Sequence, residues 1–194
     1  NGNPDWWYER QEKLSKDMLQ RMRELGMQPV IPGFSGQIPD ELTSLSTYIT
    51  SGDILDNGKW AKGGYERPNI LKPGSASYNA CAKVYYEELE KVMGVSELYN
   101  ITPFYDGALP TGITNEECYP NIMDALNSYH TAVVADTKAS YNIDEKAKWF
   151  IQYWNDMPQS GAFSAMSGYG DRFVALDLNA EASRYAKWDT DYFA

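Results

Sequence analysis

Three aspartates follow apolar runs of the sequence, at positions where a carboxylate could act on a bound sugar: Asp106, Asp156 and Asp177. Two carboxyl groups suffice to hydrolyse a glycosidic bond, because one protonates the leaving oxygen while the other attacks the sugar or activates water. Asp106 is the best placed acid, since it follows two aromatic residues and Gly107 lets the backbone turn sharply behind it. An Asp before a Gly is also common in turns that serve the backbone alone.

The other two aspartates have weaker sequence contexts. Asp177 could instead cap a helix that begins near Asn179, or orient a neighbouring side chain by hydrogen bonding. Glu181, one helical turn later, is explained by the preference of helix starts for negative charge. Asp106 is therefore the one catalytic residue that we predict.

Aromatic residues are frequent in this chain, at 14% of the sequence with six Trp and fifteen Tyr. An aromatic ring packs well against the C–H face of a pyranose while its polar edge stays in water. This composition suits a protein that binds sugars, although aromatic side chains also fill protein cores.

Net charge and residue counts argue against several other functions. The formal charge of −10 and the pI near 4.6 disfavour nucleic acid and anionic membrane surfaces, which both require clusters of Lys and Arg. The sequence contains one histidine, His130, which argues against a His-rich metal site and against a Ser/His/Asp triad. We expect His130 to be a packing or helix-surface residue. We predict no metal and no cofactor.

Cys81 and Cys118 could form one disulfide, but two free thiols fit their number and spacing better.

No apolar run reaches the roughly twenty residues that a membrane span requires. The chain begins with Asn1 and Gly2, which resembles the interior of a longer protein. We therefore expect a fragment that the remainder of its fold, or another chain, completes.

Helical and strand patterns alternate along the chain. Amphipathic spacing predicts helices, glycines predict their ends, and short apolar runs predict buried strands. The predicted helices are 8–25, 76–93, 118–140 and, more weakly, 163–169, and the predicted strands are 27–32, 98–105, 147–154 and 172–178. Residues 37–73 have no sustained periodicity and are interpreted as a long loop inserted in a single domain, with short helices at most.

Apolar strands that alternate with helices indicate an α/β fold with a parallel sheet covered on both faces. Four such units amount to about half of an eight-stranded (β/α) barrel, the TIM-barrel type, which usually takes about 250 residues. A small doubly wound sheet is the alternative fold. No glycine-rich phosphate loop follows any strand, which disfavours a nucleotide fold.

Ligands in both folds bind at the carboxyl ends of the strands. Four strand ends therefore form one candidate site: 32–34, 104–106, 154–156 and 177–179. Each end places an aromatic or polar residue after a run of aliphatic ones.

Several of these segments resemble glycoside hydrolase family 89, the α-N-acetylglucosaminidases. The segment 25–39, with the sequence LGMQPVIPGFSGQIP, is similar to the Gly-Met-Pro-Val-Pro-Phe-Gly-Pro pattern of that family, and the segments 99–110, 151–154 and 174–181 occur in the same order. The resemblance spans nearly the whole chain. It implies a retaining hydrolase that removes terminal α-linked N-acetylglucosamine from glycans without a metal.

The resemblance also implies roles for individual residues. The family's acid/base is a glutamate, and its role carries over to Asp106. The Asp side chain is one methylene shorter, which moves the proton donor back by about 1 Å. A displacement of that size can lower the rate by about a hundredfold. The family's nucleophile is a glutamate on a later strand, beyond the end of this chain. Together with the strand ends, the resemblance predicts that the substrate contacts Phe34, Trp60, Tyr105, Trp154 and Leu178.

Two further expectations concern location and alternative functions. The sequon at Asn100 falls in a predicted buried strand, which favours a secreted, periplasmic or cell-surface bacterial protein over a glycosylated, lysosome-type one. A relative that binds sugars without catalysis, and a barrel fragment that assembles with a partner chain, remain alternatives to the enzyme.

Overall fold

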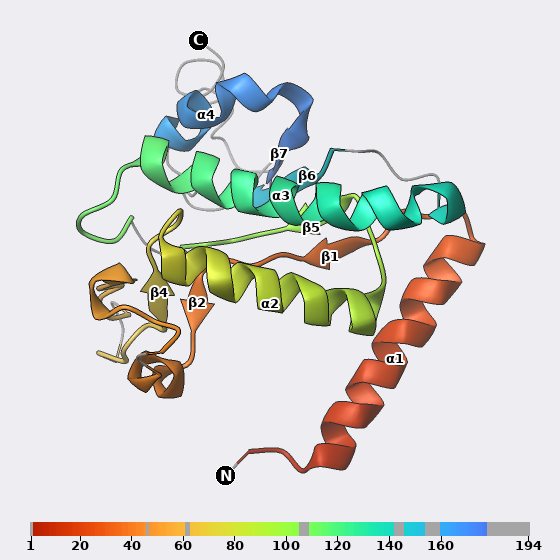
Figure 1. The fold of residues 1–194 in the computed structure, drawn as a ribbon, viewed down its shortest axis with the longest axis horizontal. Helices are drawn as coiled ribbons and strands as arrows, with labels where there is room; N and C mark the ends of the chain where they lie inside the picture. The colour runs from red at the N-terminus through yellow and green to blue at the C-terminus, as the bar shows by residue number, and fades with distance from the viewer. Residues whose placement is uncertain are drawn as a thin grey trace.

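The computed structural model describes residues 2–45, 47–60, 63–104, 109–141, 146–153 and 160–177. Helices and strands alternate along most of it, as Figure 1 shows. The α-helices are α1 (Asp5–Glu24), α2 (Ala76–Met93), α3 (Asn115–Tyr141) and α4 (Ser160–Met166). The strands are β1 (Val30–Pro32), β2 (Gln37–Ile38), β3 (Ile54–Leu55), β4 (Asn69–Leu71), β5 (Leu98–Asn100), β6 (Lys148–Tyr153) and β7 (Phe173–Asp177), and the 3₁₀ helices are η1 (Asp40–Ser44), η2 (Ser51–Asp53) and η3 (Ser167–Arg172).

Four strands form a parallel sheet in the order β1-β5-β6-β7. This spatial order is also the order along the chain and never reverses. Because crossovers between parallel strands are right-handed, an unreversed order places the connecting helices on one face of the sheet. Figure 1 shows α2 and α3 running side by side along that face. The arrangement is an arc of a (β/α) barrel, as the sequence predicts.

The side of the sheet that carries the helices holds the core. Ile31, Tyr99 and Trp149 are at most 2% exposed and belong to one cluster with Tyr86 of α2 and Ile122 of α3. Elsewhere on the sheet, Val30 is 42% exposed and Leu176 is 39% exposed. In a complete barrel, side chains of the inner sheet face pack against those of other strands, so exposed apolar residues here fit a partial barrel.

The predicted elements agree closely with the observed ones. The range of α2 is as predicted, because Ser75 caps its first turn with a 3.1 Å hydrogen bond from the Tyr78 N–H and Gly94 ends it at a φ of +71°. Strand β5 is shorter than predicted and ends at Asn100. Helix α1 buries only Leu19, whereas Leu14 and Met18, which recur with it at helical spacing, are about half exposed.

The segment 37–73 differs most from its prediction. It contains the expected short helices, η1 and η2, but also a three-stranded antiparallel sheet in the order β2-β4-β3. Ile70 and Leu71 of the central strand are fully buried. This small sheet follows the carboxyl end of β1 directly along the chain, and we call it the accessory sheet.

Cysteine and histidine side chains lie in the core or near it. Cys81 and Cys118 are both free, and burial raises the pKa of each thiol. His130 is fully buried and lies edge-on to the ring of Tyr99, with 6.0 Å between centroids. The predicted packing role of His130 is thus confirmed.

Candidate functional site at the carboxyl ends of the strands

The parallel register brings the carboxyl ends of the four strands to one edge of the sheet. Pro32 pairs with Asn100, and Tyr153 pairs with Asp177 at the ends of β6 and β7. The ladder continues beyond β1, where the Gly33 N–H donates to the Asn100 carbonyl at 2.8 Å. The Ile101 N–H likewise donates to the Phe150 carbonyl at 3.3 Å. The predicted strand ends therefore share one edge as far as the structure describes them.

Gly33 lets the first two strand ends approach closely. A Cβ atom at Gly33 would lie 2.5 Å from Cγ1 of Ile101 and 3.2 Å from the hydroxyl of Tyr86. Real Cβ atoms essentially never come within 2.5 Å of another heavy atom, so with any other residue here the Ile101 side chain or its backbone would have to shift. The edge depends on glycine at this position for steric reasons.

Tyrosines of α2 hold the backbone that leaves β1. The Phe34 N–H donates to the hydroxyl of Tyr86 at 3.1 Å, and the Phe34 carbonyl accepts from the hydroxyl of Tyr78 at 3.2 Å. The Tyr85 hydroxyl donates to the Pro32 carbonyl at 3.4 Å. Burial raises the pKa of Tyr78 and of Tyr86 well above the ordinary value, so both stay protonated near neutral pH.

The sequence prediction missed these tyrosine contacts. Helical spacing in the predicted helix 76–93 places Tyr78 and Tyr85 on one face, but it does not show what their hydroxyls contact. The hydroxyl groups could have predicted these contacts. A buried Tyr hydroxyl requires a hydrogen-bond partner, and the backbone of the loop at the strand end offers one.

Phe34, a predicted substrate contact, is only 6% exposed. Its ring packs against those of Tyr78 and Tyr85, with centroids 5.1 and 5.4 Å away. Direct contact between Phe34 and a substrate stays a prediction. In the structure the ring packs against tyrosines of α2, next to the carboxyl end of β1.

Two side chains fix the backbone that leaves β5. Trp149 donates its indole N–H to the Ile101 carbonyl at 2.8 Å, and Gln37 of β2 donates its amide to the Pro103 carbonyl at 3.4 Å. Phe104 is buried and packs edge-on against Tyr119 of α3. The chain is thus anchored up to the residue that precedes Tyr105 and Asp106.

The remaining predicted site residues fall mostly outside the described part of the chain. Tyr105, Asp106, Trp154, Asp156 and Leu178 all lie there. For Asp177 the structure describes the backbone at the end of β7 and not the side chain.

Trp60 is described and lies between β3 and β4. The Arg67 guanidinium stacks over its ring, 4.8 Å from the centroid. This cation–π contact occupies one face of the indole, so a sugar would have to use its other face or its edge.

The described residues contain neither a metal site nor a helix that could span a membrane. No three His, Cys, Asp or Glu side chains gather closely enough to hold a metal ion within those ranges. None of the described helices combines the length and apolarity required to cross a bilayer.

A separate hollow of about 640 Å³ lies between α2 and α3. Its lining contains the charged or polar residues Lys83, Glu87, Glu90, Asp124 and Tyr129 together with alanines and Val133. These side chains come from the two covering helices, so this hollow is distinct from the carboxyl edge of the sheet.

Comparison with known proteins adds a sequence match over almost the whole chain. Residues 1–193 match the family model described as the alpha-N-acetylglucosaminidase TIM-barrel domain. Human alpha-N-acetylglucosaminidase is 26% identical over 188 residues, which cover 92% of this chain and 23% of the human protein.

Solved structures of a family 89 glycoside hydrolase from Clostridium perfringens have the same fold. Its complex with PUGNAc superimposes with a TM-score of 0.77 at 25% identity, covering 94% of this chain and 19% of that one. A variant with two glutamates replaced by glutamine, in complex with its substrate GlcNAc-alpha-1,4-galactose, gives a TM-score of 0.79 at 24% identity, covering 99% of this chain and 20% of that one. The chain thus spans about a fifth of the length of these relatives.

Proposed function

Since this chain belongs to the alpha-N-acetylglucosaminidase TIM-barrel family, we propose that it forms part of the catalytic barrel of a retaining glycoside hydrolase. The enzyme would remove terminal α-linked N-acetylglucosamine from glycans. The observation that supports this most strongly is the shared edge of β1, β5, β6 and β7, where barrel enzymes bind their substrates.

Asp106 is the proposed acid/base. It follows the anchored backbone of Pro103 and Phe104 by two residues. In a retaining hydrolase the acid protonates the glycosidic oxygen while a carboxylate attacks the anomeric carbon, and the acid then activates the water that releases the sugar. The second carboxylate is proposed to be a glutamate outside this chain, as in the family that it resembles.

The proposed substrate pocket combines five aromatic or apolar residues around the strand ends. Tyr105 lies beside the acid in sequence, and Trp154 and Leu178 follow β6 and β7. Phe34 follows β1, and Trp60, in the connection between β3 and β4, is the fifth proposed contact. This chemistry requires no metal or cofactor, since two carboxyl groups perform the proton transfer and the attack.

The proposal extends to where the protein works. A glycan-degrading enzyme of this type meets its substrate outside the cytoplasm, so we propose a secreted, periplasmic or cell-surface location in a bacterium. A lysosome-type compartment is the counterpart if the source is eukaryotic.

Hydrolysis of a chromogenic α-N-acetylglucosaminide tests the catalytic proposal through Asp106. Asp106→Asn removes the acid and should lower kcat/KM by about 100-fold to 10,000-fold. Asp106→Glu restores the length of the family's acid. It should leave kcat/KM unchanged or raise it, and the increase should not exceed about a hundredfold. The measurement is kcat/KM for the three forms in the complete barrel, which supplies the second carboxylate, with circular dichroism to verify folding.

Two other results would argue for different functions. If no form hydrolyses the substrate while all three bind N-acetylglucosamine, the protein is a sugar-binding relative without catalysis. The exposed apolar residues Val30 and Leu176 on the parallel sheet favour a third candidate, a barrel segment that another chain completes. In that case activity would appear only when the completing segment is added.

A further inference from the structure

A hollow of about 480 Å³ lies at the amino ends of β6 and β7, away from the carboxyl edge of the sheet. Lys148 begins β6 and Arg172 directly precedes β7, so the parallel pairing of these strands starts beside both residues. The hollow is lined by these two cations together with Lys146, Tyr169, Asp171 and two glycines of η3. The structure describes every one of these residues.

The charge around this hollow differs from that of the whole chain. The sequence has a formal charge of −10, whereas three of the four charged side chains that line the hollow are cationic. The acid among them, Asp171, lies 3.7 Å from Nζ of Lys148, beyond hydrogen-bonding distance, and its side chain is 88% exposed. Water screens such an exposed pair, so Asp171 offsets little of the positive charge.

Arg172 is held in position by an aromatic ring. Its guanidinium stacks over Tyr169, 5.2 Å from the ring centroid. The Tyr169 hydroxyl in turn donates to Oδ1 of Asp124 in α3 at 2.7 Å. Burial and this hydrogen bond raise the pKa of Tyr169 to about 12, so the hydroxyl remains a donor near neutral pH. The guanidinium is therefore oriented before any ligand binds.

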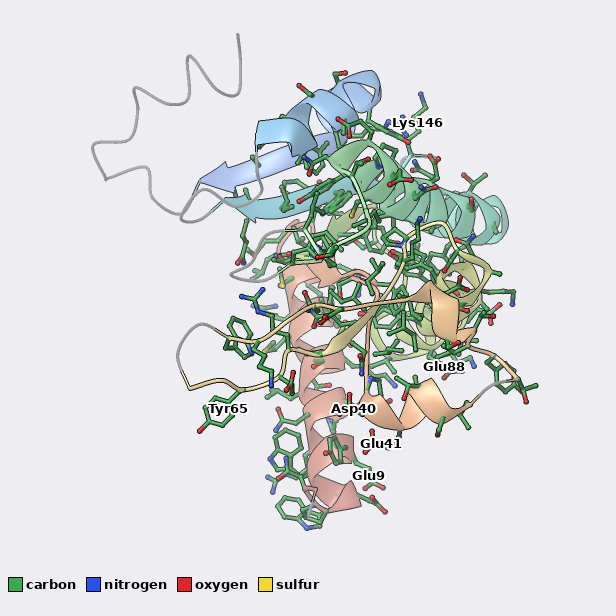
Figure 2. All side chains as sticks on the ribbon, turned by 90° about the vertical axis from the view of Figure 1, so that its left-hand side faces the viewer. Glu9, Asp40, Glu41, Tyr65, Glu88 and Lys146 are labelled. Atoms are coloured by element: carbon green, nitrogen blue, oxygen red, sulfur yellow. The ribbon has the colours of Figure 1, made fainter. Side chains whose placement is uncertain are left out.

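Glycines keep the cationic side chains accessible. A Cβ atom at Gly168 or at Gly170 would meet no heavy atom within 4 Å, and the φ of +57° at Gly170 favours glycine. The space above this part of the η3 backbone is thus open. Figure 2 shows Lys146 at the surface of the molecule, well separated from Asp40 and Tyr65.

We propose that this hollow binds a tetrahedral oxyanion, a phosphate or sulfate group. The planar fork of the Arg172 guanidinium matches two oxygens of such a group and donates parallel hydrogen bonds to them. Lys146 and Lys148 add positive charge and further donors. A neutral sugar lacks the charge that this site requires, so the inference is independent of the proposed function.

The test titrates the ¹⁵N-labelled full chain at constant ionic strength with three probes: inorganic phosphate, glucose 6-phosphate and glucose. Both anions should give saturable shifts of the backbone amides of Lys148, Gly170 and Arg172, and glucose should give none. Equal affinities for the two anions would show that the free oxyanion suffices. Tighter binding of glucose 6-phosphate would show that the group is recognised on a sugar. Either result supports the site.

Variants of the lining residues separate a defined site from general attraction. Arg172→Gln should weaken binding of phosphate by about threefold to tenfold. Arg172→Lys should weaken it less, because it keeps the charge and loses only the fork. Lys148→Gln should also weaken it, and this variant tests the site if Arg172→Gln does not fold.

Arg21→Gln provides the matched control, because it makes the same change of charge on α1, which Figure 1 shows apart from α4 and β7. It should leave the affinity for phosphate unchanged. Equal weakening by Arg172→Gln and Arg21→Gln would overturn the inference, as would the absence of saturable shifts with both anions. Either outcome would leave the proposed function standing.

Discussion

Gly33 shows how one residue at the strand ends controls the geometry of the site. Its φ is not positive, so the backbone alone does not require glycine there. The requirement comes from the nearby Ile101 side chain, whose Cγ1 lies 2.5 Å from the position of a Cβ atom. Residues that surround Gly33 are buried, including Ile31 and Tyr86, and buried neighbours have little room to move.

Gly33→Ala should therefore destabilise the fold by about 1–3 kcal/mol, the usual cost of overpacking a core. Urea denaturation followed by circular dichroism would measure the change in the free energy of unfolding. Gly52→Ala is the control, because no heavy atom lies within 4 Å of its Cβ position and its φ is not positive. Similar free energies of unfolding for the two variants would contradict the steric account.

Sequence analysis identified which residues end the strands but not what their side chains contact. Phe34 follows an apolar run and precedes a polar loop, so its place at the strand end was predictable. Its burial against Tyr78 and Tyr85 was not, because these residues lie more than forty positions away in the sequence. Contacts between distant segments depend on the packing of helix against sheet, which local periodicity does not encode.

At the scale of elements, α3 returns the chain from the loop that follows β5, and its first turn is held by a capping box. The Glu117 N–H donates to Oγ1 of Thr114 at 3.2 Å, and the Thr114 N–H donates to Oε2 of Glu117 at 3.1 Å. The capping box thus fixes the start of the helix, which lies nine positions after the proposed acid at Asp106.

Thr114→Ala removes this cap and should lower the free energy of unfolding by about 0.5–2 kcal/mol. Thr131→Ala makes the same change at an exposed position within α3 and should be neutral or slightly stabilising, since Ala is the better helix former. Thermal or urea unfolding of both variants would measure the difference. Equal effects of the two substitutions would show that the cap contributes nothing.

The helices and parallel strands were predictable from sequence, and the accessory sheet was not. Helix α2 has about five turns of regular spacing between a Ser and a Gly, which is a long signal with two defined ends. Strands β2 and β3 contain two residues each, too few for any alternation to be recognised. Their pairing depends on β4, which begins 14 positions after the end of β3 and 31 positions after the end of β2.

At the scale of the whole molecule, the order of the strands decides between the two folds that the sequence allowed. A doubly wound sheet reverses its order at a switch point and has helices on both faces. The order β1-β5-β6-β7 does not reverse. Because both folds contain the same alternation of helix and strand, composition and periodicity could not distinguish them.

The central claim is that the carboxyl edge of the parallel sheet binds the sugar. Titration of the ¹⁵N-labelled full chain with N-acetylglucosamine, followed through backbone amide resonances, tests it without depending on catalysis. We expect the largest shifts in the segments 33–37 and 102–104 at the carboxyl edge. We expect no shift for Lys148 at the start of β6 or for Arg172, which directly precedes β7. Shifts confined to the hollow between α2 and α3 or to the opposite edge would contradict the claim, as would no shifts at all.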